Sequence, residues 1–203
     1  MKKFRADALS KKQNYKLLSG SVIPRPIAFV TSQDKDGHLN AAPFSFFNVI
    51  NSAPPMIMIS TGRSEGKRKD TSLNIEETES FVVHITDEDT VEQINHTAAP
   101  LTRNQNELER TSLNCVDSEL VAVPGIEQAK IRMECKLDRI IPLGDPQEGS
   151  DLIIGEVVMF HIDESVYIED SKIDPDALNA VARLAGNDYA SLGNKFTIER
   201  PMQ

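Results

Sequence analysis

The chain contains little cysteine, no tryptophan and no long apolar run. Its two cysteines, Cys115 and Cys135, provide no disulfide framework, so reduced thiols in a cytoplasmic protein are expected. No apolar run approaches the roughly 20 residues that span a bilayer. The first twelve residues carry charge but lack the apolar core of a secretory signal. These absences predict a cytoplasmic protein with no membrane partner.

Several catalytic signatures are also absent. No G-x-S-x-G elbow occurs, and no G-x-G-x-x-G follows a predicted strand. The segment 62–68 resembles a phosphate-binding loop but is one residue short and lacks Ser or Thr after the lysine. The four histidines have no metal-ligand spacing, and histidines within strands, such as His84 and His161, are expected to be structural. We therefore predict no metal site and no catalytic side chain, so any chemistry is expected to come from a cofactor.

The charge balance excludes nucleic acid as the main partner. The net charge is −9 over 203 residues, whereas nucleic-acid affinity depends mainly on cationic contacts to phosphate. The apolar fraction of 39% and the charged fraction of 26% are ordinary for a globular protein. With no internal repeat or low-complexity linker, residues 1–203 are read as one domain with a core at about 20–201.

Strand patterns predominate along the chain. Residues 131–143 and 152–162 alternate apolar and polar side chains, which predicts two long half-buried strands. A helix is expected to begin at the N-cap cluster Asp70-Thr71-Ser72, another to run from Asp174 to Leu184, and a short strand to cover 196–198. Antiparallel strands in succession with short inserted helices favour a closed or nearly closed β-barrel, a mainly β fold.

The stretch 24–72 carries the functional signal. Its apolar runs are typical of buried strands, and between and after them stand small hydroxyl and amide side chains. It ends in a basic cluster of Arg63, Lys67, Arg68 and Lys69 ahead of the predicted helix. A helix start presents free N–H groups and the positive end of its dipole to a phosphate. Flat apolar walls beside an anion site suit a planar phosphorylated ligand, although a basic cluster can also be a solvated loop.

The ordered motifs resemble the flavin reductase family with the FMN-binding split barrel, especially its flavoredoxin-like branch. The matching motifs are P-R-P-I-A-F-V-T-S, N-x-A-P-F-S-F-F-N, K-D-T, F-V-V, E-C-K-L, G-E-V-V, R-L-A-G-N-D-Y and E-R-P. The resemblance implies a six-stranded antiparallel Greek-key split barrel with short flanking helices. It also implies a homodimer with FMN at or near the subunit interface.

The resemblance further implies a set of cofactor-binding residues. Lys69 and Thr71 are expected to hold the phosphate, and Arg183 and Tyr189 to lie near the outer part of the flavin pocket. The residues expected to line the ring system and ribityl chain are Thr31, Ser32, Ser45, Phe46, Phe47, Asn48, Ser60, Thr61 and Gly62.

The expected function is that of an FMN-dependent oxidoreductase. NADH or NADPH is the expected electron donor, and a second flavin or another redox partner is the expected acceptor. An FMN-binding electron carrier or sensor without nicotinamide turnover is an alternative that the same residues allow. A barrel that binds a different ligand, such as haem, is a third.

Overall fold

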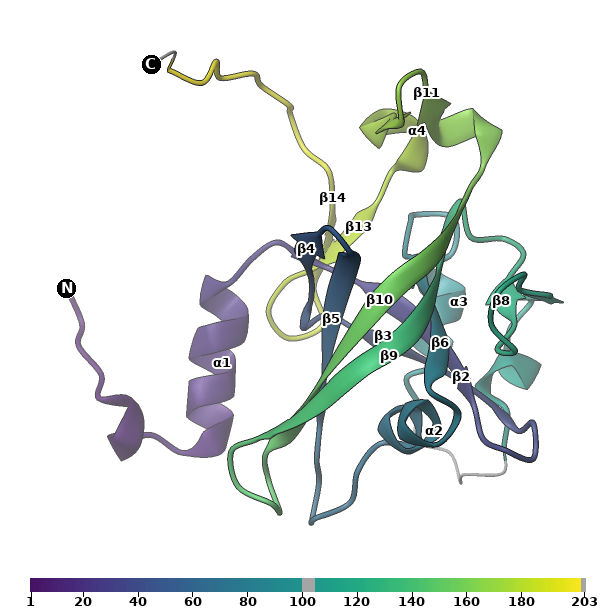
Figure 1. Cartoon of the computed structure of the whole chain (residues 1–203). Helices are drawn as coiled ribbons and strands as arrows, with labels where there is room; N and C mark the ends of the chain where they lie inside the picture. The colour runs from purple at the N-terminus through teal and green to yellow at the C-terminus, as the bar shows by residue number, and fades with distance from the viewer. Residues whose placement is uncertain (100–104, 202–203) are drawn as a thin grey trace.

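The computed structural model describes residues 1–99 and 105–201. Its main element is a seven-stranded antiparallel sheet in the order β3-β2-β6-β9-β10-β5-β4, which curls into a split barrel (Figure 1). The strands are β2 (Ala28–Gln33), β3 (Leu39–Phe44), β4 (Phe47–Ser52), β5 (Pro55–Gly62), β6 (Ser80–Ile85), β9 (Ile131–Leu143) and β10 (Ser150–Ile162).

The mainly β split barrel agrees with the predicted fold class. The sheet carries a seventh strand beyond the six expected, because Phe47–Ser52 adds to the edge of β5 with an irregular register between Val49 and Asn51. The turn between β3 and β4 also bonds across to β5, where the Ser60 N–H donates to the Phe46 carbonyl at 2.8 Å. This contact brings the end of β3 beside β5.

The long hairpin of β9 and β10 runs diagonally across the barrel in Figure 1. Inside the barrel, apolar side chains from facing strands form one core, which Ile75 of α2 (Asp70–Thr78) closes from the side. The largest fully buried members include Phe81, Ile59 and Ile153. Alternation of side chains along a strand sends every second residue into this core.

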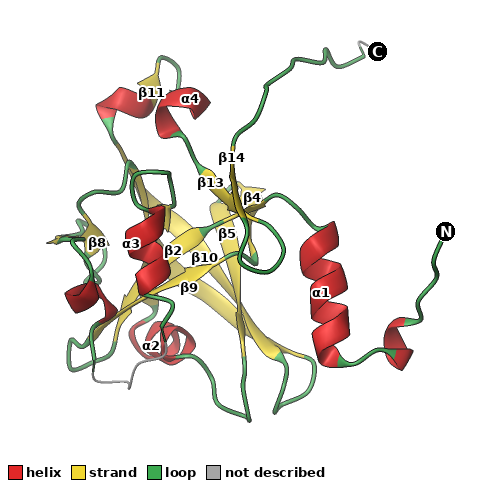
Figure 2. Cartoon of the chain, turned by 180° about the vertical axis from the view of Figure 1, so that it is seen from behind, coloured by secondary structure: helices red, strands yellow, loops and turns green. Residues whose placement is uncertain are grey.

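A second core covers the outer face of β2 and β3. Phe29 and Ala41 point outward there and pack with Ile94 of α3 (Val91–His96) and Leu108 of η2 (Glu107–Arg110). Figure 2 shows α3 in front of β2. The pair β7 (Cys115–Val116) and β8 (Gly125–Ile126) completes this layer. Both faces of β2 are therefore buried.

The smaller elements lie around the barrel. A helix α1 (Lys11–Ser21), preceded by η1 (Ala6–Ala8), stands beside the barrel in Figure 1. Its N-terminus has a capping box between Ser10 and Gln13. None of the described helices has the length and apolar composition needed to cross a membrane.

The chain after β10 differs from the sequence-based expectation. The helix predicted from Asp174 to Leu184 is only α4 (Pro175–Leu178), because Asn179 adopts a left-handed conformation with φ 51°. Residues beyond it form β13 (Val181–Arg183), which pairs with β1 (Arg25–Pro26) and β14 (Tyr189–Ser191). The strand predicted at 196–198 is absent. Two short elements precede α4, η3 (Glu164–Val166) and the hairpin of β11 (Tyr167–Ile168) with β12 (Lys172–Ile173).

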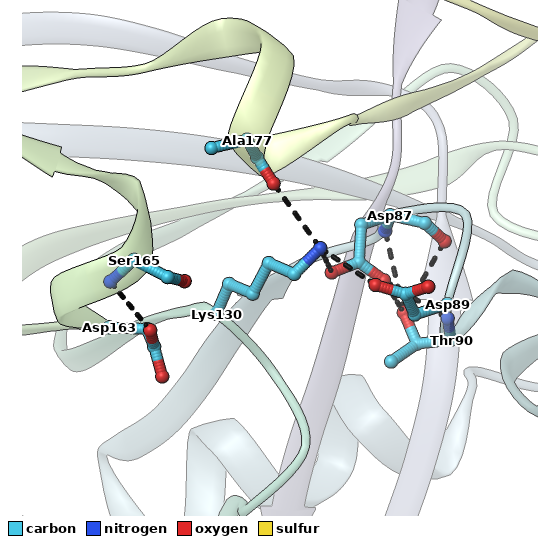
Figure 3. Close-up of polar contacts among 7 residues, drawn as sticks. All are labelled: Asp87, Asp89, Thr90, Lys130, Asp163, Ser165 and Ala177. Carbon is cyan, nitrogen blue, oxygen red and sulfur yellow. Dashed lines mark hydrogen bonds and ion pairs between the residues drawn. The ribbon is translucent and has the colours of Figure 1, made fainter.

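A lysine-centred cluster attaches α4 to the barrel (Figure 3). The Lys130 ammonium contacts Asp89 at 2.7 Å, the buried Asp87 at 3.5 Å and the Ala177 carbonyl at 3.3 Å. The Thr90 hydroxyl donates to the other Asp87 oxygen at 2.6 Å. A buried carboxylate needs such partners, so this cluster fixes the turn before α3 against the start of β9 and α4.

Candidate functional site

Three cavities meet where β3 ends: each is lined by part of the segment 43–45, and Pro43 lines all three. The α1 cavity, of about 560 Å³, lies between α1 and the ends of β5, β9 and β10. The α2 cavity, of about 400 Å³, lies at the N-terminus of α2. The β13 cavity, of about 390 Å³, lies between α1, α3 and the turn after β13. Each is within the size range of small-molecule sites.

The α2 cavity combines a helix N-terminus with Lys69 and Thr71. Lys69 is the N-cap residue, and its side chain does not cap the first turn, so N–H groups there are open to another acceptor. The buried Thr71 hydroxyl accepts from Asn40 Nδ2 at 2.9 Å. Its own proton is therefore available to donate. This end of α2 is suited to an anion.

Two carboxyl groups also line the α2 cavity, Asp70 and Glu107. Burial raises the pKa of Glu107, and the nearby Asp70 charge adds to this, while hydrogen bonds from backbone N–H groups, including that of Ala41 at 3.0 Å, oppose it. Protonation of Glu107 is thus easier than for a solvated glutamate. The negative charge next to the helix N-terminus is correspondingly easier to neutralise.

Two arginines of the basic cluster are paired with carboxylates, which the sequence of the cluster does not indicate. Arg63 and Arg68 both bind the buried Asp151 carboxylate, Arg68 through Nε at 2.7 Å, and Arg68 also pairs with Glu76 at 2.5 Å. With these partners the corner is close to neutral. Among the described residues, Lys69 is the cluster's lysine that faces the α2 cavity. The positive charge predicted for this patch is therefore reduced by pairing with Asp151, 83 residues or more along the chain, and with the nearby Glu76.

The β13 cavity presents a stacked pair of flat groups. The Arg183 guanidinium carbon lies 4.3 Å from the centre of the Tyr189 ring. Arg183 is held by the Gly186 carbonyl at 2.5 Å, and the Tyr189 hydroxyl donates to Asn95 Oδ1 at 3.0 Å. Guanidinium stacked on an aromatic face is a favourable contact. The cavity wall is thus flat and cationic, which suits a polar ring.

The structure distributes the predicted site residues over different environments. Eight of them line one of the three cavities: Ser45, Phe46, Ser60, Gly62, Lys69, Thr71, Arg183 and Tyr189. Phe47 and Asn48 line a separate apolar cavity of about 690 Å³ beside β4.

The other three predicted residues are buried beneath the site. The Thr31 hydroxyl donates to the Pro124 carbonyl at 2.7 Å, on the outer side of β2. Ser32 accepts from Asn40 Nδ2 at 3.4 Å, and Thr61 shares a 2.5 Å hydrogen bond with Ser72. Ser32 and Thr61 therefore support the α2 N-terminus from below and do not line a cavity.

Sequence reasoning did not single out several of the lining residues. Tyr15 lines the α1 and β13 cavities, Asn95 of α3 lines the β13 cavity, and Glu107 of η2 lines the α2 cavity. Asn40 and Pro43 belong to the N-x-A-P motif, so the motif itself was a signal for them. For Tyr15 the local sequence contains no comparable signal.

The two histidines on strands are hydrogen-bonded within the protein. His84 is buried, its Nδ1 lies 2.8 Å from the Phe29 carbonyl, and its Nε2 accepts from the Ile126 N–H at 2.9 Å. Since a carbonyl only accepts and an N–H only donates, the proton is on Nδ1 and the ring is neutral. Burial lowers the pKa of His84 to about 4. His161 lies on β10, where its Nε2 is 2.6 Å from Glu134.

Known proteins are similar to this chain in both sequence and structure. Residues 19–175 match the family model described as "Flavin reductase like domain". An uncharacterized protein of Bacillus subtilis, YwrF, is 54% identical over 201 residues, which are 98% of each chain.

Two solved structures are also similar. Nitrilotriacetate monooxygenase component B from Bacillus cereus is 48% identical with a TM-score of 0.95, over 98% of both chains. The 2-nitrobenzoate 2-nitroreductase NbaA of Pseudomonas fluorescens is 32% identical with a TM-score of 0.88, over 98% of this chain and 96% of the other.

Proposed function

Because this chain belongs to the flavin reductase family, we propose that it is an FMN-dependent oxidoreductase that uses NADH or NADPH as electron donor. The observation that carries the proposal is the junction of three cavities at residues 43–45, with a helix N-terminus in one and a stacked arginine and tyrosine in another. A monooxygenase component and a nitroreductase among the similar structures support redox chemistry.

The residues present fit the chemistry of FMN. The Lys69 ammonium, the Thr71 hydroxyl and the first-turn N–H groups of α2 would hold the phosphate. Arg183 and Tyr189 would contact the outer part of the flavin, and Ser45 lines both the α1 and the β13 cavity. When bound, FMN supplies hydride acceptance from the nicotinamide and electron transfer to an acceptor.

The protein's contribution is binding, orientation and electrostatics. The cavities contain no cysteine or histidine among the described lining residues. Positive charge from Arg183 would stabilise negative charge that develops on a bound ring. Apolar lining from Phe44 and Phe46 excludes water from one side. Because the cofactor would supply the redox chemistry, no general base from the chain is required.

We also propose that the protein works as a homodimer. The edge strand β4 exposes Val49 and Ile50, which are 67% and 45% exposed, next to the apolar cavity beside β4. Exposed apolar side chains gathered beside an apolar cavity are typical of an interaction surface. Light scattering coupled to size exclusion tests this, and a mass of 22.5 kDa, that of one chain, would contradict it.

The absorption spectrum of freshly purified protein, before and after addition of FMN, tests the proposed function. Bound FMN gives bands in the near-ultraviolet and the blue, whereas haem gives a Soret band. Oxidation of NADH and NADPH in the presence of FMN is then followed at steady state. Flavin binding without turnover of either nicotinamide contradicts the reductase and supports an electron carrier or sensor.

A further inference from the structure

A buried arginine on β1 connects three of the walls of the β13 cavity. Arg25 is 6% exposed, and among the described residues no carboxylate lies within ion-pair distance of its guanidinium. An unpaired buried charge is costly unless hydrogen bonds satisfy it. The partners of Arg25 therefore indicate what this residue holds in place.

The partners come from separate segments of the chain. Arg25 Nη1 donates to the carbonyls of Ser19 and Val22 at 2.5 and 2.7 Å, at the C-terminus of α1. Nη2 donates to the Leu184 carbonyl at 2.8 Å, and Nε contacts Ser45 Oγ at 3.5 Å. The negative end of the α1 dipole favours a cation at this position.

Each of these segments also supplies a side chain to the β13 cavity. Helix α1 supplies Tyr15, the β3–β4 turn supplies Ser45, and the segment around Leu184 supplies Arg183 and Tyr189. Arg25 is itself opposite Arg183 in the pairing of β1 with β13. A single planar guanidinium thus sets the spacing of three walls, in a fork geometry that lysine does not reproduce.

We propose that Arg25 is a positioning residue for the β13 cavity, and that the spacing it sets determines how well the cavity receives the ring end of a flavin. This assignment rests on the proposed function. It differs from the role of Lys69 and Thr71, which act on the phosphate end. Arg25 does not line the cavity and acts through the segments that it bonds.

The test compares Arg25→Lys, Arg25→Gln and the control Arg139→Lys. Arg139 is an exposed arginine on β9 paired with its neighbour Asp138. Each variant is first shown to be folded by circular dichroism at the temperature of measurement. Dissociation constants for FMN and for riboflavin are then measured by fluorescence, together with the midpoint potential of bound FMN.

We expect Arg25→Lys to raise both dissociation constants by the same factor of about ten, because the ring is common to both ligands. We expect both Arg25 variants to lower the midpoint potential of bound FMN below the wild-type value, because a displaced Arg183 stabilises the reduced ring less well. A role in folding alone leaves this potential at the wild-type value. Arg139→Lys is expected to match the wild type in every measurement.

Four results would overturn the assignment. Three of them are dissociation constants for Arg25→Lys within twofold of the wild type, a loss confined to FMN, and midpoint potentials in both Arg25 variants equal to that of the wild type. These three leave the proposed function intact if the wild type binds FMN. The fourth is a wild-type protein that binds neither flavin, which refutes the proposed function and this assignment together.

Discussion

The carboxylate of Asp151 on β10 lies 2.7 Å from Nε of Arg68, in the loop that leads into α2. Burial alone raises the pKa of Asp151, but hydrogen bonds from Arg63 and Arg68 and their charges outweigh it, so the pKa lies below the ordinary 3.8. The contribution of the ionised Asp151 to folding stability is therefore present above about pH 4 and is lost as the pH falls through the lowered pKa.

We expect Asp151→Asn to lower the free energy of unfolding by about 3 kcal/mol at pH 7, because two largely buried guanidinium groups lose their carboxylate. Urea titration at pH 7 and pH 3 measures this. Asp138→Asn, which alters a carboxylate paired with the exposed Arg139, is the control and is expected to cost less than about 1 kcal/mol. Equal losses in the two variants would contradict the prediction.

The phosphate end of the α2 cavity gives a second prediction. The double variant Lys69→Ala with Thr71→Ala removes two donors and is expected to weaken FMN by about ten- to hundredfold per lost contact, with little effect on riboflavin. Ligand titrations measure both affinities. Lys67→Ala, at an exposed lysine of the same loop, is the control. A similar loss for both ligands would place the phosphate elsewhere.

The neutral His84 gives a third prediction, on pH. Because its pKa of about 4 lies below the ordinary 6.5, the unfolded chain binds a proton that the folded chain rejects between these values. Stability therefore falls as the pH is lowered from 6.5 to 4, by at most about 1.4 kcal/mol per unit from this group.

The variant His84→Asn tests whether protonation of His84 makes stability depend on pH. The amide N–H can still reach the Phe29 carbonyl, but the Ile126 N–H loses its acceptor, at a cost of about 1–3 kcal/mol at pH 7. The difference in stability between wild type and variant is expected to shrink at pH 4.5. A difference that is constant with pH would show that His84 does not titrate as described.

A fourth prediction concerns the barrel core. A Cβ atom at Gly155 would lie 2.4 Å from Cζ of Phe81, so Gly155→Ala forces the packed Phe81 ring to move. We expect a loss of about 1–3 kcal/mol in the free energy of unfolding. Gly193→Ala, where a Cβ atom meets nothing within 4 Å, is the control. A thermal melt of each variant is sufficient, and equal melting temperatures would contradict the prediction.

The sequence predicts the strands of the barrel better than the elements that surround it. The strand at 131–143 has the predicted bounds because its alternation is local and long. The prediction of a single helix over 174–184 was wrong. The structure of this segment depends on pairing of Val181–Arg183 with β1, more than 150 residues earlier in the chain. Local propensity contains no information about that partner.

The same distinction applies to the site. The helix N-terminus beside Lys69 follows from a local motif, although the helix begins at Asp70 with Lys69 as its N-cap residue. The pairing of Arg63 and Arg68 with Asp151 does not follow from a local motif, since it joins segments more than 80 residues apart. The role inferred for Arg25 likewise depends on carbonyl groups of two segments and on the Ser45 hydroxyl of a third, which side-chain patterns do not reveal.

The common wall at residues 43–45 has a practical consequence for kinetic work. Pro43 borders all three cavities, so a replacement of it would affect every binding event that we propose at them in a single step. Rate constants from such a variant would be composites that cannot be assigned to one event. Residues that border one cavity each, such as Lys69, Arg183 and Leu143, are the ones whose replacement separates these events.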